Sequence, residues 1–306
     1  MRHQAFTLII LGLVALSCRE SKPTTPGGDP GPDPSGLEPV AKLAPPQFEE
    51  VQKLIGEKKW DEALAAAEQE LAAHPGNPKL LFFQGFAHFN RKDFEKALAS
   101  FEAVRKQRVV SLELTISLSE TLFYLKRYEA CEQVLREGME KFPKAAALWY
   151  NLGGIYAEKK DPENTKKMYA EALLRDPGFG PALYSLADLH ATEKDWPRAV
   201  ELLTKLAAQE PYREMAHLRL AVVKSYQKNW DEALGHLAEV EKTNPEAAKP
   251  LREKILVSRA FSELGELIRT KKCKEARARF EVIRKEHPGS AALPKAQELL
   301  SRECPR

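Results

Sequence analysis

The sequence predicts an all-α protein in which one helix pair is repeated along the chain. From residue 47 onward the apolar residues follow helical spacing, and no stretch shows the alternation typical of strands. A small residue recurs every 34 positions, at Ala63, Ala97, Cys131, Thr165, Ala199 and Ala233. Twelve positions after each of these stand Pro75, Val109, Pro143, Pro177, Pro211 and Pro245. Proline at nearly every equivalent position is far beyond chance, so the chain is a tandem array rather than one or two globular domains.

Each copy is predicted to fold as two antiparallel helices, A and B. Helix B begins near an aromatic residue or a proline, at Trp60, Phe94, Tyr128, Pro162, Trp196 and Trp230. The small residue three positions later lets helix A approach closely, and a small residue in helix A, such as Gly85 or Gly153, does the same from the other side. The proline at the end of the copy stops helix B because it lacks an amide donor and clashes with the preceding turn.

The fourth copy carries the most specific motif. Residues 149–156 read Trp-Tyr-Asn-Leu-Gly-Gly-Ile-Tyr, which resembles the W-x2-L-G-x2-Y opening of the tetratricopeptide repeat. The A-x3-[F/L/Y] spacing and the closing proline of other copies fit the same family. The resemblance implies a right-handed superhelical solenoid of helix-turn-helix units, with six units over 45–247.

Residues 248–303 are predicted to form an irregular seventh unit and a C-terminal capping helix. The small residue of this unit, Ala276, follows Ala233 by 43 positions instead of 34. We therefore expect its helix A to be lengthened, from about Lys249 to Thr270. A capping helix is expected over 290–302, with Ser290 as its N-cap.

The amino terminus resembles a bacterial lipoprotein signal peptide over residues 1–17. Its apolar run of 11 residues, 6–16, is shorter than the roughly 20 residues that cross a bilayer. Residues 15–18, Ala-Leu-Ser-Cys, are similar to a lipobox, which implies that Cys18 carries the lipid. Acyl chains of that kind anchor a protein durably, and Arg19 after the cysteine favours the periplasmic face of the outer membrane. An ordinary secretory signal with a chance cysteine is the alternative.

Residues 18–44 are predicted to be an extended tether. Eight of the chain's 21 prolines lie between residues 19 and 46, with almost no large apolar residue among them. Such a segment buries too little surface to offset its ordering entropy. A second interpretation is that this segment is itself a ligand for a recognition module.

Composition and motifs argue against several function classes. Forty-seven Lys and Arg against 44 Asp and Glu leave a net charge of +3, so no strong field would attract nucleic acid. The phosphate-binding, nucleophile-elbow and zinc-protease motifs are absent, and no two of the seven His share a helix face at i, i+3 or i+4. We therefore expect no catalytic residue, no metal, no cofactor and no small-molecule substrate.

The family resemblance implies a concave surface lined by helices A. Carried over by position, it assigns eight aromatic residues to a partner-binding groove, namely Phe82, Phe86, Phe89, Phe123, Tyr124, Tyr150, Tyr184 and Tyr226. The neighbouring residues Asn151 and Arg219 are expected to face the same groove. Rings left facing a groove would mark a partner site. The alternative for Phe82 and Phe86 is that they pack against the next helix A.

The cysteines after Cys18 are predicted to differ in state. Cys131 occupies a core position and is expected to be a buried thiol. If helix B of the seventh unit and the capping helix form an antiparallel hairpin, Cys273 lies opposite Cys304, and an oxidising compartment would allow a disulfide. The alternative is two thiols without a partner.

The resulting functional hypothesis is a membrane-anchored periplasmic scaffold that binds a protein or peptide segment of another cell-envelope component in its groove. An assembly or adaptor role, similar to that of a pilotin, follows from the resemblance. Two alternatives remain, a self-associating structural spacer and an enzyme with a site in the 248–270 insertion.

Overall fold

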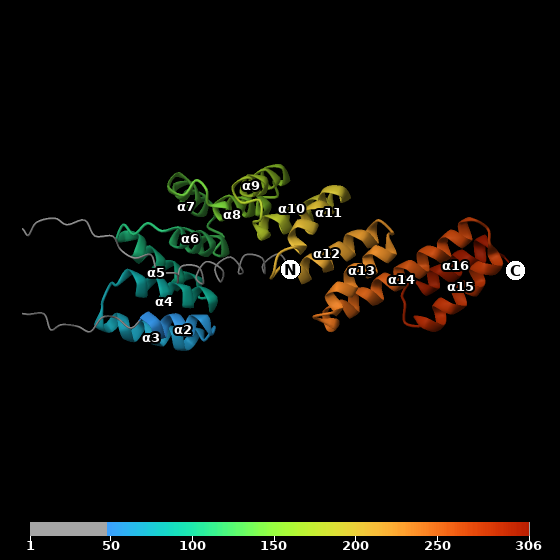
Figure 1. Cartoon of the computed structure of the whole chain (residues 1–306), viewed down its shortest axis with the longest axis horizontal. Coiled ribbons are helices and arrows are strands. Elements are labelled where there is room, and N and C mark those ends of the chain that lie inside the picture. Colours follow the sequence, from blue (N-terminus) through green and yellow to red (C-terminus); the bar gives the residue numbers. More distant parts are fainter. Residues whose placement is uncertain (1–47, 306) are drawn as a thin grey trace, which may run out of the picture. The chain divides into compact units, whose positions relative to one another are not determined.

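The computed structural model describes residues 48–305, and every regular element in that range is an α-helix (Figure 1). The predicted signal peptide, Cys18 and the tether lie outside the described residues. None of the helices from residue 48 to 305 combines the length and the apolar character that crossing a membrane requires.

The chain divides into two compact units, Met1–Ala182 and Leu183–Arg306. The helices of unit 1 are α2 (Phe48–Gly56), α3 (Trp60–Ala73), α4 (Pro78–Asn90), α5 (Phe94–Lys106), α6 (Leu112–Tyr124), α7 (Tyr128–Lys141), α8 (Ala146–Glu158) and α9 (Pro162–Arg175). Helix α10 (Gly180–Thr192) contains the division. Unit 2 continues with α11 (Trp196–Ala207), α12 (Arg213–Tyr226), α13 (Trp230–Glu241), α14 (Pro245–Arg269), α15 (Cys273–Glu286) and α16 (Leu293–Glu303).

Within each unit the helices form the predicted pairs. From α2 to α9, and from α11 to α16, each pair of helices joined by a short turn is in contact. Helices two apart also touch, α4 with α6 and α6 with α8 in unit 1, and α12 with α14 in unit 2. Helices A therefore form one layer and helices B the other, which is the solenoid arrangement that the sequence predicts.

Glycines in helices A set the close approach within a pair. A Cβ atom at Gly85 would lie 2.7 Å from Cε1 of Phe101, which is fully buried in α5. A Cβ atom at Gly153 would lie 2.5 Å from Cε1 of Tyr169 in α9. Small residues at these places let an aromatic ring from helix B pack directly on the backbone of helix A.

Lysine occupies a left-handed backbone position at the A-to-B turn of all seven helix pairs. Their φ values lie between +56° and +68°, at Lys58, Lys92, Lys126, Lys160, Lys194, Lys228 and Lys271. At Lys92, for example, the amide donates to the Phe89 carbonyl at 2.9 Å, and the Asp93 amide donates to the His88 carbonyl at 2.9 Å. This is the Schellman turn, in which glycine usually stands because an L side chain costs about 1–2 kcal/mol.

Two boundaries differ from the sequence prediction. Helix α14 begins at Pro245 rather than near Lys249, because the Asn244 side chain accepts from the Ala247 amide and Pro245 needs no donor at the first position. Pro245 thus starts a helix instead of ending one. Helix α16 begins at Leu293, and its N-cap is Ala292 rather than Ser290.

The carboxyl-terminal hairpin of α15 and α16 packs on the end of α14. Leu264, Phe280, Ile283 and Leu300 form its buried core. Cys273 and Cys304 lie opposite each other with Cα atoms 5.3 Å apart and are joined by a disulfide, the pairing that the hairpin geometry predicts.

Candidate functional site

Half of the residues that the sequence assigns to the groove are buried in the structure, so that assignment is wrong for them. Phe86, Phe89, Phe123, Tyr150 and Asn151 are each at most 9% exposed. The physical reason is that in unit 1 the helix A aromatics are long enough to reach neighbouring rings and pack there. Tyr124 and Phe82 are half-buried, and the Phe82 ring lies 5.6 Å from that of Phe101.

The rings of unit 1 form a packed layer between consecutive helix pairs. Phe94 and Tyr124 stack with ring centroids 4.8 Å apart and an interplanar angle of 3°. Phe89 contacts both rings edge-on at 5.5 Å. Phe86 packs against Trp60 at 6.0 Å. These contacts cover the apolar surface that was expected to face a partner.

Tyr150 and Asn151 are held between helices. Tyr150 stacks on Tyr169 at 5.1 Å and meets Phe179 at 5.7 Å. The Asn151 side-chain amide donates to the Ser119 hydroxyl at 3.4 Å. Burial raises the pKa of the neighbouring Glu120 well above its ordinary value, although a hydrogen bond with Asn151 opposes the shift, so the neutral acid is favoured.

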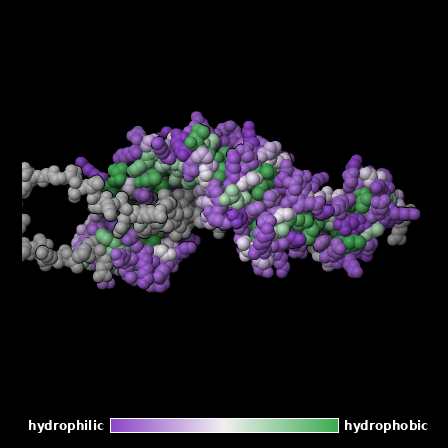
Figure 2. All heavy atoms as spheres, in the orientation of Figure 1, coloured by the Kyte–Doolittle hydropathy of each residue, from purple (hydrophilic) through white to green (hydrophobic). Residues whose placement is uncertain are grey.

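In unit 2 the predicted residues Tyr184, Arg219 and Tyr226 do line a cavity. It has a volume of about 730 Å³ and lies between α10, α11 and α12, and we call it the unit-2 groove. Its wall includes Asp188, Ala191, Trp196, Val222 and the three predicted residues. Tyr226 is 68% exposed, an unusual position for a large aromatic ring on a surface that is otherwise mainly hydrophilic (Figure 2).

The polar and aromatic side chains of this groove hold one another in place. Tyr226 stacks on Trp196 with centroids 5.9 Å apart and an interplanar angle of 12°. The Arg219 guanidinium forms an ion pair with Asp188 and lies 5.6 Å from the Tyr184 ring centroid. The result is an aromatic platform beside a half-buried charged pair, a combination that binds both apolar side chains and polar groups.

The groove continues along unit 2. A second cavity of about 510 Å³ shares Val222 and Tyr226 with the first and reaches α14. A third, of about 760 Å³, shares Lys228, Phe261 and Ser262 with the second. The three cavities thus follow one another along α10, α12 and α14, each sharing lining residues with the next, and we call them together the trough.

One exchange between repeats leaves the Trp196–Tyr226 stack open on one side. Trp196 and Tyr226 stand three repeats after Phe94 and Tyr124, so the same stacked pair occurs twice. Ala191 stands where the earlier pair is closed by Phe89. A methyl group in place of a benzyl group leaves one side of the aromatic platform uncovered.

Sequence reasoning missed the contribution of helices B to the groove. Trp196 lines the unit-2 groove and Trp230 lines the second cavity, although the repeat pattern treats both only as markers of where helix B begins. Phe261, from the lengthened helix α14, lines the second and third cavities. The sequence carries no signal that separates them from Trp60, which stands at the same repeat position and packs against the buried Phe86.

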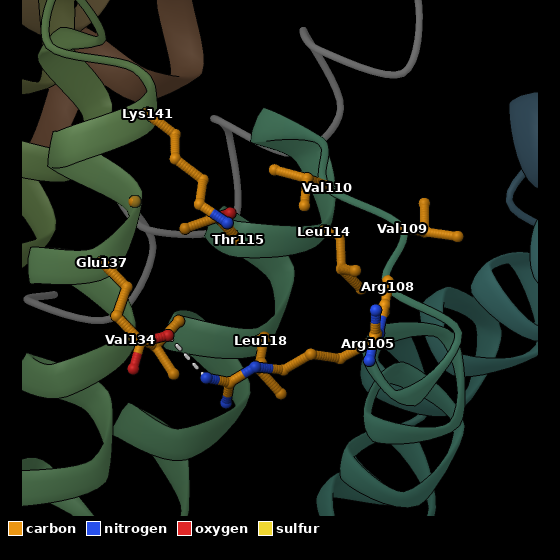
Figure 3. Close-up of a pocket in the computed structure, with 11 residues that line it drawn as sticks. Arg105, Arg108, Val109, Val110, Leu114, Thr115, Leu118, Val134, Glu137 and Lys141 are labelled. Carbon is orange, nitrogen blue, oxygen red and sulfur yellow. Dashed lines mark hydrogen bonds and ion pairs between the residues drawn. The ribbon is translucent and has the colours of Figure 1, made fainter.

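Unit 1 has a separate, smaller cavity of about 350 Å³ at a B-to-A turn (Figure 3). Val110 and Leu114 line it on one side and Val134 on the other, and the Arg105 guanidinium donates to the Glu137 carboxylate at 2.6 Å across it (Figure 3). It opens at the one copy that has Val109 in place of proline. Its size suits a single side chain, so it offers a smaller binding surface than the trough of unit 2.

The remaining cysteine, histidine and acidic side chains of residues 48–305 are dispersed with respect to metal binding. Among residues 48–305 no three His, Cys, Asp or Glu side chains are arranged to hold a metal ion. Burial raises the pKa of the Cys131 thiol to about 12, and its Sγ donates to the Ser119 carbonyl at 3.0 Å. In the 248–270 segment, Arg259 and Glu263 form an ion pair at 3.0 Å, and both side chains are half-buried.

His217 and His236 are brought together from different helices, which a search along one helix face could not detect. Their Nδ1 atoms lie 3.1 Å apart between α12 and α13. Burial lowers the pKa of both rings, and the proximity of His217 lowers that of His236 further. Two neutral imidazoles, one donating to the other, fit this geometry.

The repeated helix pairs and their two layers define an α-solenoid repeat protein. Residues 146–179 match the tetratricopeptide repeat family, and residues 57–138 match the family of subunit 3 of the anaphase-promoting complex, or cyclosome. The chain is a tetratricopeptide-repeat protein. No curated protein matches it in sequence.

Solved structures share its fold. The chain is similar to PilW, described as a widely conserved type IV pilus biogenesis factor, with a TM-score of 0.57, 17% identity, and coverage of 68% of this chain and 96% of PilW. For PilF of Pseudomonas aeruginosa the TM-score is 0.56, with 14% identity over 68% and 94% of the two chains. For a thermophilic tetratricopeptide protein of Thermus thermophilus the TM-score is 0.50, with 20% identity over 57% and 95%. Identities this low establish the fold alone.

Proposed function

We propose that the protein is a membrane-anchored scaffold of the bacterial cell envelope that binds an extended segment of another envelope protein in the unit-2 groove. The observation that carries this proposal is the trough that begins with this groove, a row of three cavities in which each shares lining residues with the next. Helices pack at about 8–10 Å, so the faces of α10, α12 and α14 together span about 20 Å. That length accommodates roughly six residues of extended chain at about 3.3 Å each.

The lining of the groove indicates the kind of segment that would bind. The Trp196–Tyr226 platform would take a flat or branched apolar side chain. Arg219 and Asp188 form an ion pair with each other. When a segment binds, the Arg219 guanidinium would donate hydrogen bonds to its polar groups and the Asp188 carboxylate would accept them. The occupant is therefore a mixed apolar and polar peptide rather than a small apolar molecule.

The anchor in this proposal is a lipid on Cys18, which would hold the solenoid at the periplasmic face of the outer membrane. The extended tether over residues 18–44 would let the groove reach a partner away from the bilayer surface. By analogy with PilW, a type IV pilus biogenesis factor of the same fold, we assign the protein an assembly or adaptor role in an envelope complex.

Co-purification from detergent-solubilised membranes tests the groove. Arg219→Ala/Tyr226→Ala removes the charged pair and half of the platform, and we expect a protein recovered with the wild type to be lost. The matched control is Val282→Ala/Arg284→Ala, which removes an exposed apolar side chain and an exposed arginine from α15, outside the trough. An identical set of partners with wild type and groove variant would refute the proposal.

Light scattering after size-exclusion chromatography, which measures the oligomeric state, distinguishes the scaffold from a self-associating spacer. A monomer at every concentration supports a scaffold with a different protein as partner. An oligomer that grows with concentration and is lost in the groove variant would instead show that a second copy fills the groove.

Fractionation tests the anchor. The Cys18→Ser chain lacks the thiol that would accept the lipid, and we expect it to move from the membrane to the soluble fraction. A chain that stays in the membrane fraction after this change would contradict the lipid anchor without affecting the groove proposal.

A further inference from the structure

The aromatic side chains of unit 2 gather along the trough. Of the seven Phe, Trp and Tyr residues between Leu183 and Arg306, five line the three cavities, namely Tyr184, Trp196, Tyr226, Trp230 and Phe261. Tyr226 is exposed and the other four are half-buried, so each ring keeps part of its surface open to solvent. Partly open rings in series fit a ligand that has flat apolar groups at short intervals.

The trough also carries hydrogen-bond donors that the fold does not use. Lys194, Lys228 and Lys254 line its cavities and are exposed, and their ammonium groups form no ion pair or hydrogen bond within the part of the chain that the structure describes. An ammonium group donates up to three hydrogen bonds and accepts none, and the indole nitrogens of Trp196 and Trp230 are donors only as well. A bound segment would therefore meet an excess of donors.

The carboxylates of the trough are already engaged. Each of the three forms an ion pair with arginine, namely Asp188 with Arg219, Glu263 with Arg259 and Arg279, and Glu266 with Arg269. The other side-chain acceptors are hydroxyl oxygens, such as those of Thr192 and Ser225, whose protons go to carbonyls of their own helices at 2.7 Å. Strong acceptors for the backbone N–H groups of a ligand are thus scarce.

A proline-rich segment matches this balance better than other extended segments do. Every residue except proline brings a backbone N–H, which loses its hydrogen bond to water on binding and needs an acceptor in the groove. Proline brings only a carbonyl, and the polyproline II helix forms no internal hydrogen bonds, so its carbonyls are free to accept. Its pyrrolidine rings also pack well in grooves lined by aromatic side chains.

We propose that the trough binds a proline-rich segment of the partner protein in the polyproline II conformation. Prolines would pack on the Trp196–Tyr226 platform and, further along, on Trp230 and Phe261, while the lysines donate to the carbonyls between them. At about 3.1 Å per residue, about six residues would fill the trough. This inference rests on the proposed function, because it names the chemistry of the segment that the groove would hold.

Peptide titration followed by tryptophan fluorescence tests the proposal, because two of the chain's four tryptophans line the trough. The purified full chain is titrated with an end-blocked polyproline peptide of about nine residues, which is about 28 Å long. The comparison peptide has the same length and contains alanine, serine and glutamine. We expect polyproline to bind at least tenfold more tightly, and equal binding of the two peptides would overturn the proposal.

Two variants separate the rings from the donors. Tyr226→Ala removes an exposed ring, whereas Lys228→Met/Lys254→Met removes two ammonium groups and keeps every ring. Each should weaken polyproline binding at least fivefold without lowering the thermal unfolding midpoint. The matched control is Leu174→Ala, which removes a side chain that is 75% exposed on α9, outside the trough, and should leave binding unchanged. Full affinity of the lysine variant would overturn the donor match.

The remaining outcomes identify which statement fails. If polyproline does not bind but Arg219→Ala/Tyr226→Ala still loses the co-purified partner, the groove holds a segment of other chemistry and only this inference is overturned. The chain has a proline-rich segment of its own, which includes Pro30, Pro32 and Pro34. Binding that appears only after all three are changed to serine would overturn the assignment to another protein, since this segment would then be the occupant.

Discussion

Phe89 and Ala191 occupy the same place in the second and fifth repeats, and this exchange decides which aromatic pair is open to a partner. In unit 1 the Phe89 ring lies 5.5 Å from both Phe94 and Tyr124 and closes their stack. In unit 2 the smaller Ala191 stands at the Phe89 position, and the Trp196–Tyr226 stack borders a cavity of about 730 Å³. The same stacked aromatic pair therefore occurs in both units, and a phenylalanine ring covers it only in unit 1.

Ala191→Phe should close the unit-2 groove. The new ring would lie against the Trp196–Tyr226 stack, as Phe89 does in unit 1, and fill the space that we assign to a partner's side chain. We expect the amount of co-purified partner to fall at least tenfold, with a thermal unfolding midpoint unchanged or slightly raised by the added apolar contact.

The control for this change is Ala278→Phe, which places the same ring at an exposed site on α15. It should leave partner recovery unchanged. If Ala191→Phe also leaves recovery unchanged, the platform is not where the partner binds.

Two glycine substitutions should have opposite effects on stability. A Cβ atom at Gly85 would lie 2.7 Å from the buried Phe101 ring, so Gly85→Ala should destabilise unit 1 by about 1–3 kcal/mol through overpacking. A Cβ atom at Gly235 in α13 would meet no other atom within 4 Å, so Gly235→Ala should stabilise unit 2 by about 0.5–1 kcal/mol. Urea unfolding of both variants measures the difference.

Phe101→Leu in the Gly85→Ala background serves as the check, because the smaller side chain makes room for the methyl group and should recover part of the loss. Equal stability of Gly85→Ala and Gly235→Ala would show that the helix pair is looser than the contact implies.

The fold was predictable because each repeat has the same kinds of residue at the positions where its helices pack and end. A small residue such as Ala97, a glycine such as Gly85 and a closing proline determine where two helices meet and where the second ends. The sequence alone did not determine where α14 begins, because starts at Pro245 and near Lys249 were both compatible with it. Pro245 can stop one helix or begin the next, and the hydrogen bond from the Ala247 amide to Asn244 decided it.

The site was harder to predict because a repeat position indicates which surface of helix A a side chain faces. It does not indicate whether neighbouring side chains bury that side chain. Phe86 and Tyr184 come from positions that the family assigns to the same surface, yet Phe86 is buried against Trp60 and Tyr184 borders the groove. The difference lies in the neighbouring repeat, whose side chains either fill the space or leave it. His217 and His236 illustrate the same limit, since contact between helices is invisible to spacing along one helix.

The disulfide should stabilise the carboxyl-terminal hairpin. Cys273 and Cys304 are separated by 31 residues, and closing a loop of that length contributes about 3–4 kcal/mol by the chain-entropy estimate. Cys273→Ala/Cys304→Ala should therefore increase amide hydrogen exchange in α15 and α16 with little change in unit 1. Adding dithiothreitol to the wild type should reproduce the effect, and Cys131→Ala should not. Exchange that is identical in the oxidised and reduced wild type would contradict a stabilising role.

Acidification should loosen the contact between α12 and α13 through His217 and His236. Burial lowers the folded-state pKa of both rings, so between that value and the unfolded value of about 6.5 the unfolded chain binds more protons. The stability that the neutral pair contributes is therefore present above about pH 6.5 and is lost as the pH falls toward the folded-state value.

The charged neighbours of the two histidines do not change the direction of this pH dependence. Glu239 favours protonation of both rings, but burial outweighs it in each, and Arg213 near His217 and Lys224 near His236 act in the opposite direction. We expect hydrogen exchange in α12 and α13 to rise as the pH falls from 7.5 to 5.5, after correction for the intrinsic exchange rate. His217→Gln/His236→Gln should flatten this dependence, whereas His287→Gln, at the C-cap of α15, should leave it intact. A double variant with the same pH dependence as the wild type would show that the pair does not titrate in this range, and that carboxylates elsewhere in unit 2 govern its response to acid.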